Sequence, residues 1–231
     1  MIVGIEPTGH YWLNLAHFLE EKGIPLVMVN PMHVKRSKEL GDNLPTKHDA
    51  KDALVIARLV KDGRFSYPRI LHEVEAELRA GTTFRASLIK ERNAVLIQMI
   101  RWLDQYFPEF VQVFPSFGNL VLAVLENTPF PMDIVDQTVE GIMERYRQSE
   151  GLKCPQKPKI QKLIEVSRDS IGITEGQRMA RIQIATLVRR YRQLEQEIAT
   201  LTEELVALAQ TTVEYEWLQT IPGLGDATIV E

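Results

Sequence analysis

Apolar residues recur in alternating steps of four and three along the last quarter of the chain, and this spacing constrains the fold more than any other feature. The series contains Leu187, Tyr191, Leu194, Ile198, Leu201, Leu205 and Leu208, and Ala180 and Ile184 extend it backwards. About four heptads of this kind are typical of a helix in a coiled coil. A helix buried in a bundle within one chain gives a similar stripe, so both interpretations stay open.

A second long helix is predicted over residues 74–107. Its apolar residues form two adjacent stripes, so we expect it to pack against more than one neighbour. The first stripe holds Leu88, Val95, Met99, Trp102 and Tyr106, and the second holds Ile89, Leu96, Ile100, Leu103 and Phe107. Shorter helices are predicted at 117–125, 134–147 and 159–166, with a linker at 148–159 that is rich in Pro and Lys.

The first seventy residues have a different pattern, which indicates an α/β domain. A β-branched run at 2–5, a helix at 11–22 and a strand at 25–30 form a βαβ unit with parallel strands. Leu13, Ala16, His17 and Leu19 are expected on the inner side of that first helix. Further helices are predicted at 32–40 and at 49–61, the latter with Ala53, Ile56, Ala57 and Val60 as its core stripe.

Two parallel strands alone do not make a stable sheet, so we expect a partial α/β domain whose earlier strands precede Met1. The expected fold class is α/β plus α. The α/β part covers 1–70, a helical and coiled-coil region covers 71–215, and a further domain begins at 216–231.

Three acidic residues in the α/β part are candidate metal ligands. Glu6 ends the first strand, and Asp49 and Asp52 open the helix at 49–61. Residues three apart on a helix share a face, and carboxylates are the ligands that Mg²⁺ prefers. A pair of such ions can serve phosphodiester cleavage. Acids in the first turn of a helix also serve as caps, so this ordinary interpretation stays open.

The net charge is −4, but the charges are grouped in blocks that predict nucleic-acid contacts. Residues 33–69 carry nine Lys or Arg against five Asp or Glu; residues 178–192 carry five Arg and no acid, and residues 195–216 six Glu and no base. The Pro-Gly-Leu-Gly turn at 222–225 resembles a DNA-binding hairpin whose glycines approach phosphate closely, although a plain connection between two helices would look the same. The candidate contacts are Lys35, Arg36, Lys38, Lys47, Lys51, Arg189, Arg190, Arg192, Gly223 and Gly225.

Other classes of protein are not supported by the sequence. No apolar run reaches the roughly 18 residues of a membrane span, and no basic segment precedes an apolar one at the start. Cys154 is the only cysteine, so neither a disulfide frame nor a cysteine zinc cluster is expected. A cytoplasmic location is the expectation.

The residues that carry these features resemble the DEDD transposases of bacterial insertion sequences. The resemblance lies in residues 4–12, in Val29-Asn30-Pro31 with Val34-Lys35, in residues 47–53 and in Ile221-Pro222-Gly223-Leu224-Gly225. These enzymes are recombinases guided by a bridge RNA. They have an N-terminal domain like the resolvase RuvC, a coiled coil, and a C-terminal transposase domain with a catalytic serine.

The resemblance implies that Glu6, Asp49 and Asp52 are the second, third and fourth acids of a site for Mg²⁺ or Mn²⁺. It also implies that the first acid precedes Met1 and that the serine follows Glu231. We therefore expect a truncated reading frame that is not competent alone, with DNA, guide RNA and a second copy of the chain as partners. The alternative is a non-catalytic coiled-coil module that binds nucleic acid and modulates a full-length transposase.

Overall fold

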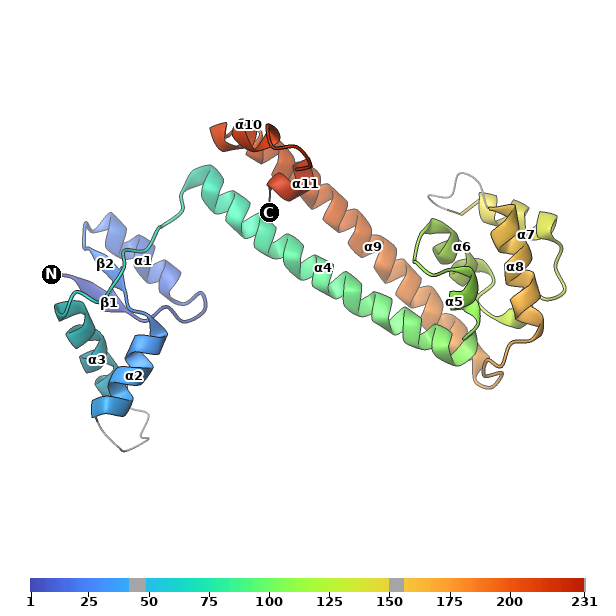
Figure 1. Cartoon of the computed structure of the whole chain (residues 1–231), viewed down its shortest axis with the longest axis horizontal. Coiled ribbons are helices and arrows are strands. Elements are labelled where there is room, and N and C mark those ends of the chain that lie inside the picture. The colour runs from blue at the N-terminus through green and yellow to red at the C-terminus, as the bar shows by residue number, and fades with distance from the viewer. Residues whose placement is uncertain (42–48, 150–155, 231) are drawn as a thin grey trace. The chain divides into compact units, whose positions relative to one another are not determined.

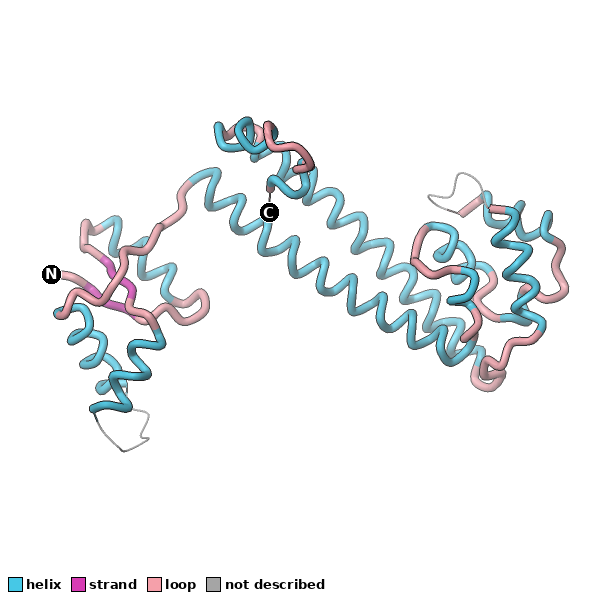
Figure 2. The backbone as a smooth tube through the Cα atoms, in the orientation of Figure 1, coloured by secondary structure: helices cyan, strands magenta, loops and turns pink. Residues whose placement is uncertain are grey.

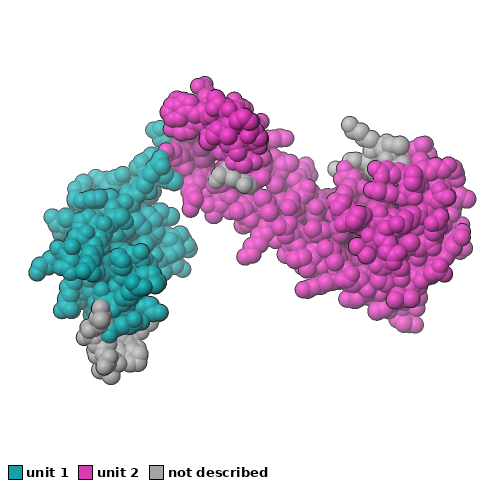
Figure 3. All heavy atoms as spheres, viewed as in Figure 1, with its two compact units in different colours: residues 1–73 teal, residues 74–231 magenta. Residues whose placement is uncertain are grey.

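A computed structural model describes residues 1–41, 49–149 and 156–230. The chain divides into two compact units, Met1–Glu73 and Val74–Glu231 (Figure 3). Each unit is described by itself.

The first unit contains a two-stranded parallel sheet. β1 (Val3–Ile5) pairs with β2 (Leu26–Met28), with Gly4 opposite Val27, and α1 (Trp12–Glu21) connects the two strands. This is the predicted βαβ unit. Gly23 adopts φ +65°, the left-handed conformation that lets the chain turn from α1 into β2. Met28 also forms an antiparallel bridge to Ser66, which binds the end of the unit back onto the sheet.

Two helices follow β2, and small apolar clusters lie on both sides of the sheet. α2 spans Pro31–Gly41 and α3 spans Asp49–Lys61, the latter with the predicted bounds. One cluster has Ala16, Leu19 and Leu26 as its buried residues, and the other has Val29, Val34 and Leu59.

The predicted inner faces of α1 and α3 are buried only in part. On α3, Ile56 and Val60 are half-buried and pack on the second of these clusters. Ala53 and Ala57 are exposed because they line an open cavity beside β1. On α1, Leu13 and His17 are exposed, whereas Ala16 and Leu19 are buried as predicted.

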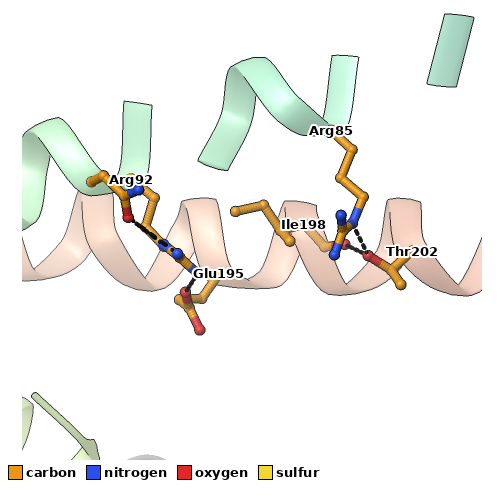
Figure 4. Close-up of polar contacts among 6 residues, drawn as sticks. Arg85, Arg92, Glu195, Ile198 and Thr202 are labelled. Carbon is orange, nitrogen blue, oxygen red and sulfur yellow. Dashed lines mark hydrogen bonds and ion pairs between the residues drawn. The ribbon is translucent and has the colours of Figure 1, made fainter. Parts of the chain in front are cut away.

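The second unit is organised by two long helices, α4 (Glu73–Tyr106) and α9 (Gln177–Ala209), which lie side by side (Figures 1 and 2). Residues nearer the start of α4 contact residues nearer the end of α9, so the helices are antiparallel. Arg85 Nε donates to Thr202 Oγ1 at 2.8 Å, and Arg92 pairs with Glu195 at 2.8 Å (Figure 4). Nearer the other end, the Trp102 indole N–H donates to the carbonyl of Ala180 at 3.0 Å.

The apolar stripes of the two helices meet in one core. Leu88, Val95, Met99 and Trp102 of α4 share a buried cluster with Ala180, Ile184, Leu187, Leu194 and Ile198 of α9. The heptad stripe of α9 therefore packs against α4 of the same chain, one of the two interpretations that the sequence left open. Association with a second chain remains a prediction.

Short helices fill the connection between α4 and α9. They are α5 (Phe110–Val113), α6 (Asn119–Asn127), the 3₁₀ helix η1 (Pro131–Asp133), α7 (Val139–Arg147) and α8 (Lys157–Arg168). The predicted helix at 134–147 begins only at Val139, because Thr138 caps it by accepting the N–H of Gly141. The predicted linker at 148–159 ends earlier than expected, since Pro158 fits the first turn of α8. Residues 150–155 of that linker lie outside the described residues.

Two short helices end the described chain. α10 spans Val213–Gln219 and α11 spans Asp226–Ile229. Tyr215 and Val230 form a second cluster with Leu205 and Ala209 of α9. Across the described residues, we find no helix of the length and apolar character that a bilayer crossing requires.

The segment before α9 lies tightly against the end of α4, which gives a test of this unit. A Cβ added at Gly172 would lie 2.1 Å from the carbonyl oxygen of Tyr106, and the neighbouring Ile173 N–H donates to Gln105 O at 2.8 Å. Gly172→Ala should therefore lower the free energy of unfolding by at least about 1–3 kcal/mol, since backbone must move to accept the methyl group. Gly118→Ala is the control, because nothing lies within 4 Å of the added Cβ. Equal midpoints for both variants in urea denaturation would contradict the close approach.

Candidate functional site

Asp49 and Asp52 lie together on the wall of a cavity in the first unit. Both belong to the first turn of α3, and the cavity of about 420 Å³ also touches β1 through Gly4. The other lining residues are Ile2, Ala53, Ile56, Ala57 and Val60. The two carboxylates thus project from an otherwise apolar wall, and they offer the hard oxygen donors that Mg²⁺ or Mn²⁺ prefers. Their chemistry fits a divalent cation.

Gly4 allows α3 to approach β1 closely. A Cβ at this position would lie 2.7 Å from Val60 Cγ2 and 3.2 Å from Ile56 Cγ2. Any other residue there would require the Val60 side chain or α3 to shift. The helix that carries both aspartates is therefore positioned by the absence of a side chain in the middle of β1.

Glu6 follows β1 directly and is half-buried. It is not among the residues that line the cavity of Asp49 and Asp52. Its carboxylate is not part of a tight cluster either. Among the described residues, the one group of three or more potential ligands within 4.8 Å of one another does not include Glu6, Asp49 or Asp52.

A lysine that the sequence assigned to nucleic acid contacts one of the acids instead. Lys38 of α2 forms an ion pair with Asp52, whose side chain is 25% exposed. The ammonium group contacts Oδ1 of Asp52, so a cation that binds through this oxygen competes with Lys38.

Most of the other basic candidates are exposed, but one forms hydrogen bonds to a carboxylate of the same unit. Lys35, Arg36, Arg189 and Arg190 are exposed on their helices. Arg192 instead reaches Glu126 of α6 through two hydrogen bonds, at 2.7 and 2.9 Å. Lys51 is half-buried, and Lys47 lies outside the described residues.

The glycine-rich turn at 222–225 connects α10 to α11. Gly223 adopts φ +92°, which only glycine adopts readily, and Gly225 is extended at the start of α11. The Tyr215 hydroxyl donates to Asp226 Oδ1 at 2.9 Å and fastens the two helices together. This carboxylate is at the start of α11, where a phosphate was expected, so an incoming anion would meet negative charge.

The sequence did not reveal one cluster of potential ligands in the first unit. His17, Glu20 and His72 lie close together, although His17 was assigned to the inner side of its helix. The spacing of three between His17 and Glu20 is a sequence signal for a shared helix face. No local pattern links these two residues to His72.

Residues 1–108 match the family model described as transposase, of the DEDD type found in insertion sequences. The first 108 residues are therefore similar to the DEDD transposase family. This segment runs from β1 to the end of α4 and therefore contains all three candidate acids. No curated protein matches the sequence.

The close approach at Gly4 predicts how the transposase segment responds to substitution. Gly4→Ala should destabilise the first unit by about 1–3 kcal/mol, because the new methyl group overlaps Val60. Val60→Ala should reverse part of this loss in the double variant, since it removes the overlapping Cγ2 atom. Hydrogen exchange of residues 1–73 measures both effects. An additive double variant would show that the contact does not limit the position of α3.

Proposed function

We propose that the first unit is a RuvC-like metal site of a transposase, which acts on the phosphodiester backbone of DNA during transposition of an insertion sequence. The supporting observation is that Asp49 and Asp52 share one cavity wall beside β1 within the segment that matches the family. We assign the catalytic domain to 1–70, a helical region to 71–215 and the start of a C-terminal transposase domain to 216–231.

In this proposal Glu6, Asp49 and Asp52 hold Mg²⁺ or Mn²⁺. When bound, such an ion stabilises charge on the attacking and leaving oxygens of a phosphate. Asp49 and Asp52 supply oxygen donors from one helix face, and Glu6 supplies a third from the end of β1. Glu6 is included because it follows β1, and ligands gather beyond the carboxyl ends of parallel strands in open α/β sheets. Lys38 neutralises Asp52 until a cation takes its place.

The proposed partners are DNA and a guide RNA, with a second copy of the chain associated through the long helices as a coiled coil. Lys35 and Arg36 of α2 lie on the helix that also carries Lys38 and would contact phosphate. Arg189 and Arg190 provide a second exposed basic surface on α9. Gly223 and Gly225 remain candidates for backbone contact with phosphate at the hairpin.

The metal site is tested by Mn²⁺ binding to the full chain, followed by electron paramagnetic resonance. Asp49→Asn and Asp52→Asn should each weaken binding at least tenfold, because each removes an anionic donor. Asp62→Asn is a matched control, since Asp62 is an exposed acid just beyond the other end of α3. Equal losses in all three variants would indicate nonspecific attraction to negative charge. Absence of binding would favour the alternative, a non-catalytic module that binds nucleic acid.

The ion pair between Lys38 and Asp52 can be tested with the same Mn²⁺ binding measurement. Lys38→Met should raise Mn²⁺ affinity, because the ammonium group no longer competes for Asp52. Lys35→Met on the same helix is the control and should change affinity much less. If Lys38→Met lowers affinity, the lysine supports the ligand geometry and does not compete with the cation.

Nucleic-acid binding should weaken steeply with salt, because each neutralised phosphate releases condensed counterion. Changing both Arg189 and Arg190 to Gln should flatten the slope of log K against log salt, by roughly 0.9 per lost contact on duplex DNA. Arg192 is left intact because it holds Glu126. Fluorescence anisotropy at several salt concentrations measures the slope. The same flattening after Glu203 and Glu204 are changed to Gln would refute the assignment to the arginine-rich half of α9.

A further inference from the structure

Three exposed side chains of the first unit converge at a place that the proposed acid site does not use. His17 and Glu20 lie one turn apart on α1, and His72 comes from the segment that follows the bridge at Ser66. One potential ligand atom from each lies within 4.8 Å of the other two. It is the one such cluster of His, Cys, Asp and Glu that the structure contains within residues 1–41, 49–149 and 156–230.

The carboxylate of Glu20 lies between the two imidazole rings. Its Oε1 atom is 3.1 Å from His72 Nε2, and its Oε2 atom is 3.9 Å from His17 Nδ1. The rings of His17 and His72 meet edge to face, with centroids 5.8 Å apart. Both imidazoles therefore direct a nitrogen towards the same small region of space.

We propose that His17, Glu20 and His72 form a zinc site. A tetrahedral zinc ion with bonds of about 2.1 Å separates its ligand atoms by about 3.4 Å, so the observed separations need only small side-chain rotations. Imidazole nitrogen with one carboxylate suits Zn²⁺, whereas Mg²⁺ prefers oxygen ligands alone. Three protein ligands leave the fourth position to water.

Such an ion would fasten the last residues of the unit to α1. This segment is already held at two points: Ser66 bridges to Met28, and Ile70 packs on the cluster of Ala16, Leu19 and Leu26. His72 lies two residues beyond Ile70 and just before α4 begins. Zinc would add a third point of attachment and would restrict the end of the unit where the long helix starts.

The zinc site and the acid site use different residues and different ion chemistry. Glu20 lines a small cavity of about 170 Å³ with Ala16, Tyr67 and Pro68, none of which lines the cavity of Asp49 and Asp52. The zinc proposal therefore stands or falls independently of the proposed transposase site.

Co²⁺ is the spectroscopic probe, added to the full chain expressed without a histidine tag. We expect visible absorption from one bound Co²⁺ per chain, which one equivalent of Zn²⁺ abolishes. We also expect Zn²⁺, but not Mg²⁺ at the same concentration, to raise the melting temperature. Absence of the Co²⁺ absorption in the unsubstituted chain overturns the proposal whatever the variants do.

Variants locate the ion. His17→Gln and His72→Gln should each weaken Co²⁺ binding at least tenfold, and both are expected to fold because the side chains are half exposed. His33→Gln, at an exposed histidine of α2, should leave it unchanged. Loss of the signal in Asp49→Asn but not in His72→Gln would place the ion at the acid site and overturn the zinc assignment.

Discussion

The packing of α4 against α9 supports the larger unit, because both helices are too long and too apolar on one side to stand alone. Their stripes share one core, into which the short helices between them also pack. The indole of Trp102 is buried there, and its N–H donates to the carbonyl of Ala180. The rings of Tyr106 and Phe130 lie tilted against it, with centroids 4.9 and 5.2 Å away. Without the packing of α4 against α9, the short helices between them would lose the apolar surface on which their side chains are buried.

In the first unit, the comparable constraint is the missing side chain of Gly4. It lets Val60 and Ile56 of α3 lie directly on β1, and so brings the first turn of α3, with its two aspartates, to the cavity beside the strand. The site thus depends on backbone packing two turns away from the carboxylates. Apolar residues that line the same cavity are accessible to solvent: Ala53 and Ala57 are exposed, and Ile2 is about half exposed.

Charge partners determine which side chains are available for ligands. Asp52 is neutralised by Lys38, Arg192 by Glu126, and Arg92 by Glu195 across the long helices. Exposed pairs of this kind contribute only about 0–1 kcal/mol each, so a metal ion or a phosphate can replace one partner without large loss of stability. The charge pattern of the sequence cannot show which basic side chains form ion pairs and which are exposed, as Arg189 and Arg190 are. The acidic partners in these ion pairs lie far away in the sequence.

The sequence by itself determined the local structure and the family resemblance. Hydrophobic periodicity predicted the βαβ unit, the bounds of α3 and the two long helices, because these patterns follow from the geometry of each element alone. The motifs around Glu6, Asp49 and Asp52 pointed to the DEDD transposases, whose family model matches residues 1–108. Only the tertiary structure decided the partner of α9, the open cavity that leaves Ala53 exposed, and the late start of α7 at Val139. It alone placed Lys38 on Asp52 and brought His72 to His17 and Glu20, because contacts between residues distant in the chain depend on how elements pack and leave no periodic trace in the sequence.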